Sequence, residues 1–146
     1  MKPFTLLALL GLSVSAHAEQ EFPRGTFQLK DLDKAKAEAA AAKKPLAFIY
    51  TDKNTTCPLC QGAADEFLDA TKSKAVIVYV DSPSTPTIWP TLPDAVKKGL
   101  EAGKFIPKIA VTDASAEKLI TSLNYDAYKQ DNKTVRDLKK ALKPEK

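Results

Sequence analysis

Histidine is almost absent from this chain, and its absence excludes several classes of active site. The only histidine among the 146 residues is His17, which lies in an N-terminal segment that we expect to be removed. The remaining chain cannot form a Cys-His dyad or a Ser-His-Asp triad. Its two cysteines cannot complete a four-ligand zinc site of the usual nitrogen and sulfur type within one chain. We therefore expect no metal site.

Glycine is also scarce, with five residues in the whole chain. They form neither a loop that cradles phosphate nor a dinucleotide-binding fingerprint, so we expect no cofactor. The 22 Lys and Arg residues exceed the 18 Asp and Glu residues, which gives a formal net charge of +4. Because basic and acidic residues are interspersed along the chain, we interpret this charge as a solubility property and expect no nucleic-acid partner.

The longest apolar stretch of the sequence lies at the N-terminus. Lys2 precedes an apolar stretch at residues 4–12, and Ala16-His17-Ala18 is a small-x-small cleavage site. The apolar stretch is too short to cross a bilayer, and no second one follows. We expect residues 1–18 to be a signal peptide cleaved after Ala18, with no membrane anchor afterwards. The sequence thus predicts a periplasmic or secreted protein, with a lead-in at residues 19–30 and one domain at residues 31–146.

Helical and apolar segments alternate along the domain, which predicts an α/β fold. We expect helices over residues 31–44, from the cysteine pair to about 71, over 93–102 and from 132 or 134 onward, and strands over 46–50, 75–80, 106–112 and 118–124. The proline-containing residues 81–92 are expected to be a loop. Crossover connections predict parallel neighbours, and the short turn at Asp113 makes the last two strands antiparallel. The result is a mixed central sheet of about four strands flanked by helices on both faces.

Cys57 and Cys60 lie between an apolar strand and a helix, with Thr55 or Thr56 expected to cap that helix. A thiol at a helix N-terminus is stabilised as thiolate by unpaired N–H groups and the helix dipole. A second thiol one turn inward is close enough to attack a mixed disulfide. We interpret Cys57 as a nucleophile and Cys60 as the resolving thiol. The alternative is a small structural disulfide, although so short a loop restrains little of the unfolded chain.

Over about residues 31–142 the chain resembles the thioredoxin superfamily, and its compact secreted bacterial members in particular. The resemblance is carried by Cys57-x-x-Cys60 after the first core strand, by the downstream Phe105-Ile106-Pro107, and by the hairpin and C-terminal helix that follow. It implies a cis peptide bond before Pro107. It also implies that Ile106, Pro107, Pro58 and Leu59 contact the substrate.

Four departures from the family pattern lie in or near the cysteine motif, and one of them is Gln61 in place of the basic residue that often follows the second cysteine. Thr56 stands where thioredoxins usually carry tryptophan, and Pro58-Leu59 replaces Gly-Pro between the cysteines. The first core strand, Ala47-Phe48-Ile49-Tyr50, lacks the buried acid that in the family takes a proton from the second thiol. The resemblance therefore leaves Asp52 or water as the proton acceptor.

What the resemblance implies is an extracytoplasmic thiol–disulfide oxidoreductase that acts on protein thiols and disulfides. It also implies a membrane or periplasmic redox partner. Ile106 before the proline and the lack of room for an inserted helical domain favour reduction of substrates, whereas Pro58 directly after Cys57 favours oxidation. We expect a reductase. The alternative is a non-enzymatic binding module that keeps the thioredoxin fold and uses its disulfide as structure.

Overall fold

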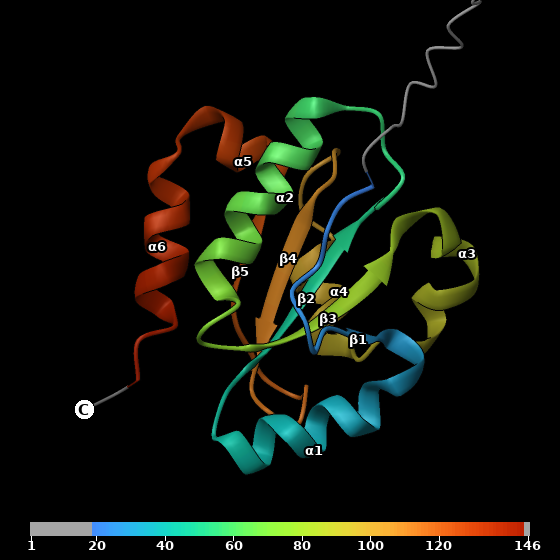
Figure 1. The fold of residues 1–146 in the computed structure, drawn as a ribbon, viewed down its shortest axis with the longest axis vertical. Helices are drawn as coiled ribbons and strands as arrows, with labels where there is room; N and C mark the ends of the chain where they lie inside the picture. The colour runs from blue at the N-terminus through green and yellow to red at the C-terminus, as the bar shows by residue number, and fades with distance from the viewer. Residues whose placement is uncertain (1–18, 145–146) are drawn as a thin grey trace, which may run out of the picture.

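Five strands form one mixed sheet in the order β1-β3-β2-β4-β5 (Figure 1). The structure is a computed structural model that describes residues 19–144, so the predicted signal peptide lies outside the described residues. β3 is parallel to both β1 and β2, whereas β4 is antiparallel to both β2 and β5. The strands are β1 (Phe27–Gln28), β2 (Leu46–Thr51), β3 (Val76–Asp81), β4 (Lys108–Thr112) and β5 (Leu119–Asn124).

Helices cover both faces of this sheet. They are α1 (Leu32–Ala42), α2 (Pro58–Thr71), α3 (Thr85–Ile88), α4 (Asp94–Leu100), α5 (Tyr125–Gln130) and α6 (Lys133–Ala141). α2 and α6 pack on one face, and α1 and α4 pack on the other (Figure 1). The predicted fold class, a mixed α/β sheet flanked by helices on both faces, is confirmed.

β2 lies at the centre of the sheet and is buried on both faces. Leu46 and Phe48 point into the α1 and α4 side of the core, whereas Ala47 and Ile49 point into the α2 and α6 side. All four side chains are fully buried. This explains why the strand reads as a continuous apolar run instead of an alternating one.

Two features of the sheet differ from the prediction. β4 is antiparallel to its neighbour β2, whereas the crossover rule predicted a parallel pair. The segment between β3 and β4 contains the short helices α3 and α4, so the chain enters β4 at the sheet end where β2 finishes. β1 is a fifth strand of two residues, which is too short to leave an apolar pattern in the sequence.

The segment at residues 81–92 is helical, although its prolines predicted a loop. It consists of two 3₁₀ turns, Ser82–Ser84 and Trp89–Thr91, on either side of α3. Each of the three elements has a proline at its first or second position. Proline is tolerated there because N–H groups of the first turn have no partner within the helix.

The lead-in at residues 19–30 is packed against the domain, although the short polar sequence of residues 19–25 predicts a loosely held segment. Gln20 is 8% exposed, and its backbone N–H donates to the Lys53 carbonyl at 2.8 Å. The Phe22 ring lies 4.7 Å from the Tyr79 ring, measured between centroids. The prediction failed because these contacts depend on backbone groups and single side chains within a polar segment.

Candidate active site

Cys57 and Cys60 form a disulfide at the start of α2, with their Cα atoms 5.3 Å apart. Cys57 is itself the N-cap residue, and its sulfur accepts a hydrogen bond from the Cys60 N–H at 3.2 Å. The expectation that Thr55 or Thr56 caps this helix was therefore wrong. Thr55 acts one step earlier, because its hydroxyl accepts from the Cys57 N–H at 3.3 Å. Pro58 follows at the first helical position.

The disulfide loop lies at the protein surface. Both cysteines are half-buried, whereas Pro58 is exposed and the Leu59 side chain is 67% exposed. This exposure leaves the loop accessible to a macromolecule.

The register of the sheet brings the predicted site segments to one end of the molecule. Tyr50, near the end of β2, pairs with Lys108 at the start of β4, and Lys108 pairs with Asn124 at the end of β5. The cysteine loop therefore leaves the sheet at the end where Pro107 enters it. The bond between Ile106 and Pro107 is cis, as the resemblance implied.

β2 contributes no acidic side chain to the site. Ile49 is buried in the core beneath α2, and Thr51, the last residue of the strand, is buried and uncharged. The carboxylate of Asp52 accepts a hydrogen bond from the Asn54 N–H at 2.9 Å. Asp52 thus stabilises the turn that leads to the cysteines.

Tyr79 on β3 contacts the loop before the cysteines, and Asp81 at the end of the same strand binds the Tyr79 hydroxyl. The Tyr79 hydroxyl donates to Asp81 Oδ1 at 2.7 Å and accepts from the Lys53 N–H at 3.4 Å. Burial and the hydrogen bond to Asp81 raise the pKa of Tyr79 above its usual value. Sequence reasoning missed both residues, although polar groups at the end of an apolar strand were a visible indication.

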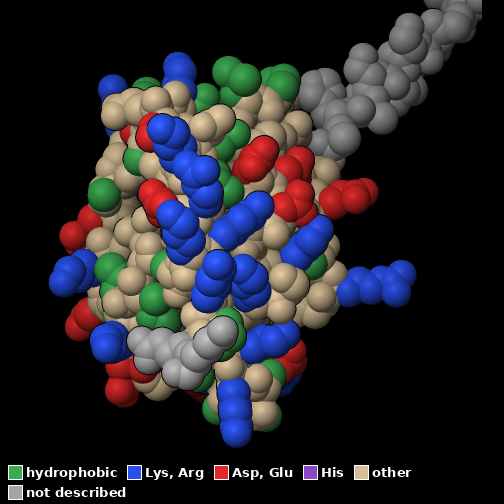
Figure 2. All heavy atoms as spheres, turned by 90° about the vertical axis from the view of Figure 1, so that its left-hand side faces the viewer, with side chains coloured by type: hydrophobic (Ala, Val, Ile, Leu, Met, Phe, Trp, Pro, Cys, Tyr) green, Lys and Arg blue, Asp and Glu red, His purple; other side chains and the backbone are tan. Residues whose placement is uncertain are grey.

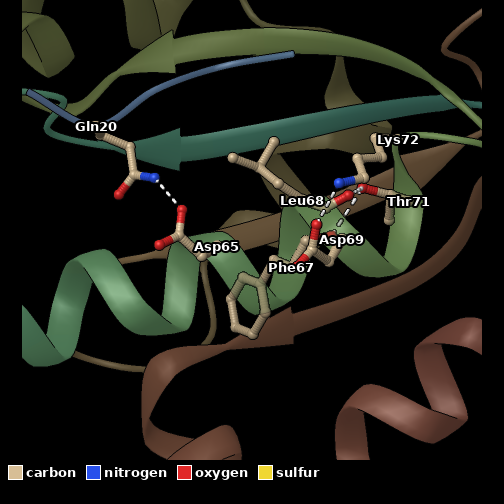
Figure 3. A network of polar contacts seen from close by, with 7 residues as sticks. All are labelled: Gln20, Asp65, Phe67, Leu68, Asp69, Thr71 and Lys72. Atoms are coloured by element: carbon tan, nitrogen blue, oxygen red, sulfur yellow. Dashed lines mark hydrogen bonds and ion pairs between the residues drawn. The ribbon is translucent and has the colours of Figure 1, made fainter.

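Gln20 fastens the lead-in to the helix that carries the cysteines (Figure 3). Its Nε2 donates to Asp65 Oδ1 on α2 at 2.5 Å. Further along α2, the Thr71 hydroxyl donates to the Phe67 carbonyl at 2.8 Å, and Lys72 pairs with Asp69. The contact between Gln20 and Asp65 thus ties the middle of α2 to a segment that precedes the whole domain in sequence.

A groove of about 570 Å³ runs beside the exposed Leu59 between α2 and α5. Pro58, Leu59, Gly62 and Ala63 line one side, and Tyr125, Tyr128 and the polar residues 129–132 line the other. Tyr128 is fixed by an edge-on contact with Phe67, with ring centroids 5.6 Å apart. The groove begins at the two residues that separate the cysteines, so a molecule bound there would lie next to the disulfide.

Charge gathers on another face. Lys and Arg side chains crowd the side of the molecule that carries α6 (Figure 2), where Lys133, Arg136, Lys139 and Lys140 are exposed.

Residues 19–144 include no cluster of three or more His, Cys, Asp or Glu side chains that would suit a metal ion. Within the same residues, no helix has the length and apolarity needed to cross a membrane.

No protein-family model and no curated protein matches this sequence. Among solved structures, the chain is similar to a disulphide isomerase from Xylella fastidiosa Temecula1, with a TM-score of 0.53 and 15% identity over 90% of this chain and 96% of that one. A DsbH oxidoreductase gives a TM-score of 0.47 and 16% identity over 83% of this chain and 88% of that one. Together with the sheet order, the first likeness shows that this chain has the thioredoxin-like fold.

Proposed function

We propose that this protein is an extracytoplasmic thiol–disulfide oxidoreductase with Cys57 as nucleophile and Cys60 as resolving thiol. One observation carries the proposal: the Cys60 N–H points at the Cys57 sulfur, 3.2 Å away, at the surface-exposed start of α2. In the reduced protein the same N–H and the helix dipole would stabilise a Cys57 thiolate. A purely structural disulfide needs neither an accessible loop nor a stabilised thiolate.

The chemistry is a two-step exchange. The Cys57 thiolate attacks one sulfur of a substrate disulfide, forms a mixed disulfide and releases one substrate thiolate, which takes up a proton. The Cys60 thiol then loses its proton to water and attacks the Cys57 sulfur, which releases the second substrate thiolate. Two electrons pass to the substrate, and the protein is left with the Cys57–Cys60 disulfide. A membrane or periplasmic dithiol partner must then reduce it again.

The surface around the disulfide suits a polypeptide substrate. Among residues 19–144, Leu59, Phe105 and Ile120 are the large apolar side chains that are exposed. Leu59 lies between the cysteines and Phe105 precedes Ile106-Pro107. We propose that Leu59, Pro58 and the Ile106-Pro107 backbone contact an extended substrate strand, which pairs with the Ile106 backbone. Apolar contacts on both sides of the sulfur suit a protein chain better than a small charged thiol.

For direction and location we propose a reductase outside the cytoplasm. Ile106 precedes the proline, and the segment between β3 and β4 contains short helices in place of an inserted domain.

The predicted signal peptide supports export. If it is cleaved as proposed, N-terminal sequencing of the exported protein should begin at Glu19. A sequence that begins at Met1 would contradict export by this route.

The function is tested by turnover with matched cysteine variants. The wild-type protein should catalyse the reduction of insulin disulfides by dithiothreitol, and Cys57→Ser should abolish the catalysis. Cys60→Ser should accumulate a mixed disulfide through Cys57, because the resolving thiol is missing.

The absence of an acid on β2 favours the alternative of a binding module. In that case a variant with serine at both positions would retain its protein partner, and the wild-type protein would show no turnover.

A further inference from the structure

Lys108 has unusual surroundings for a lysine. It is the only lysine among residues 19–144 that is buried, with 8% of its surface exposed. Its Nζ donates to the Gly103 carbonyl at 2.7 Å and to the Leu100 carbonyl at 3.0 Å. Leu100 is the last residue of α4, so its carbonyl has no partner within the helix. A cation at that end of a helix is also favoured by the helix dipole.

Asp126 binds the same segment through backbone N–H groups. It lies in the first turn of α5, and its Oδ2 accepts hydrogen bonds from the Lys104 N–H at 2.8 Å and the Phe105 N–H at 3.1 Å. The turn depends on Gly103, which has a φ of +80°. A Cβ atom there would lie 2.8 Å from Asp126 Oδ2. The segment is therefore built tightly against the start of α5.

Together the Lys108 and Asp126 side chains bind four backbone groups of residues 100–105. The cation takes two carbonyl groups, and the anion takes two N–H groups. These residues run directly into Ile106-Pro107. Because Phe105 is 52% exposed, apolar burial of its side chain does not fix this segment. Its shape depends instead on four hydrogen bonds to charged groups, which are stronger than bonds between neutral groups.

We propose that Lys108 and Asp126 are positioning residues that hold residues 103–106 in the conformation in which the Ile106 backbone pairs with a polypeptide substrate. This inference deepens the proposed function and rests on it. Neither side chain takes part in the sulfur chemistry. They set how well an extended chain aligns beside the Cys57 sulfur, and they act through the backbone between α4 and β4.

The choice of lysine supports a positioning role over a purely stabilising one. Burial of an ammonium group carries a desolvation cost, and an apolar side chain of similar volume often stabilises a protein equally well or better. Burial lowers the pKa of Lys108 below its usual value, and the Asp126 carboxylate opposes that shift. An ammonium group aimed at two carbonyl oxygens gives the segment a defined shape that methionine would not give.

Two kinds of substrate and one measurement without substrate test the inference. The variants are Lys108→Met and Asp126→Ala, with the exposed Lys98→Met as a control for loss of one positive charge. Insulin is compared with bis(2-hydroxyethyl) disulfide, which has no backbone to pair. For both variants, KM for insulin should rise about tenfold relative to KM for the small disulfide, with little change in kcat. Lys98→Met should behave like the wild-type protein.

Hydrogen exchange gives the readout that does not depend on activity. In the wild-type protein the Lys104 and Phe105 amides should be protected, and Asp126→Ala should speed their exchange at least about tenfold. Unprotected wild-type amides would overturn the positioning of the segment whatever the activity. Protected amides with an equal loss on both substrates, or no loss, would overturn its role in substrate alignment. A wild-type protein that turns over neither substrate would instead overturn the proposed function. If Asp126→Ala does not fold, Asp126→Asn, which keeps an acceptor oxygen, should give an intermediate KM.

Discussion

The two cysteines differ in their position on α2 and in their hydrogen bonds, although both are half-buried. The Cys57 sulfur caps α2 and accepts the Cys60 N–H, whereas Cys60 lies one turn inside the helix. We expect Cys57 to be the more acidic thiol, because the helix terminus stabilises its thiolate. Brief alkylation of the reduced protein near neutral pH, followed by peptide mass spectrometry, should label Cys57 first. Faster labelling of Cys60 would reverse the assigned roles.

Tyr79 predicts how stability changes at alkaline pH. Burial and its bond to Asp81 raise its pKa in the folded protein, whereas a tyrosine in the unfolded chain ionises near pH 10. Above about pH 10 the unfolded chain loses this proton and the folded protein keeps it, so the free energy of unfolding falls as pH rises. At pH 8, Tyr79→Phe should cost about 1 kcal/mol through the lost hydrogen bond.

Urea unfolding at several pH values checks this prediction. The difference in unfolding free energy between the wild-type protein and Tyr79→Phe should shrink as pH rises from about 10, because only the wild-type protein carries the titrating group. Other tyrosines and the lysines titrate in both proteins and cancel in the difference. A difference that stays constant from pH 8 to pH 11 would contradict the shift at Tyr79.

At the scale of elements, the lead-in packs against the segments around the cysteines. Phe22 packs on Tyr79, and Gln20 binds both the loop before the cysteines and α2. Phe22→Ala should therefore lower the free energy of unfolding by about 2 kcal/mol, because a half-buried aromatic contact is lost. The exposed neighbour Glu21 provides the control, since Glu21→Ala should stay within about 0.5 kcal/mol. Equal effects of the two changes in urea unfolding would mean that the lead-in does not support the domain.

Elements with a strong local pattern were predictable from the sequence. β2 is an uninterrupted apolar run, and α2 combines a proline at its start with apolar residues at helical spacing. α5 was not predicted, because Tyr125–Gln130 has no apolar period and depends on the Asn124 side chain, which accepts from the Ala127 N–H at 2.9 Å. The direction of β4 follows from the path of α3 and α4 across the sheet, which no local pattern records.

The candidate site was predictable in part for the same reason. The cysteine spacing and the Ile106-Pro107 pair are short patterns, and both were found in the sequence. Lys108 and Asp126 lie 18 positions apart and act on a third segment, so only the folded structure relates them. The position of Lys108 inside an otherwise apolar strand was the one indication available. A charged residue in such a strand merits a search for its partners.

For the molecule as a whole, the sheet places three separate segments at one end: the cysteine loop after β2, the Pro107 loop before β4, and the start of α5 after β5. The basic side chains over α6 lie along one flank of the molecule, which is on the left in Figure 1 and faces the viewer in Figure 2. The exposed apolar side chains of Leu59 and Phe105 on two of these segments are consistent with recognition of a polypeptide by shape and backbone pairing. This arrangement supports the proposed exchange of electrons between the Cys57–Cys60 pair and protein substrates.

The equilibrium reduction potential of the Cys57–Cys60 disulfide distinguishes this exchange from a purely structural role of the disulfide. It can be measured by titration against glutathione or dithiothreitol, with trapping of the thiols by alkylation. Catalytic dithiols range from about −270 mV for thioredoxin to about −120 mV for a strong oxidant, whereas structural disulfides lie below about −300 mV. We predict a value within the catalytic range and nearer to the thioredoxin end. A potential below about −300 mV, with no exchange with protein thiols, would contradict a catalytic role and leave the disulfide as a structural element.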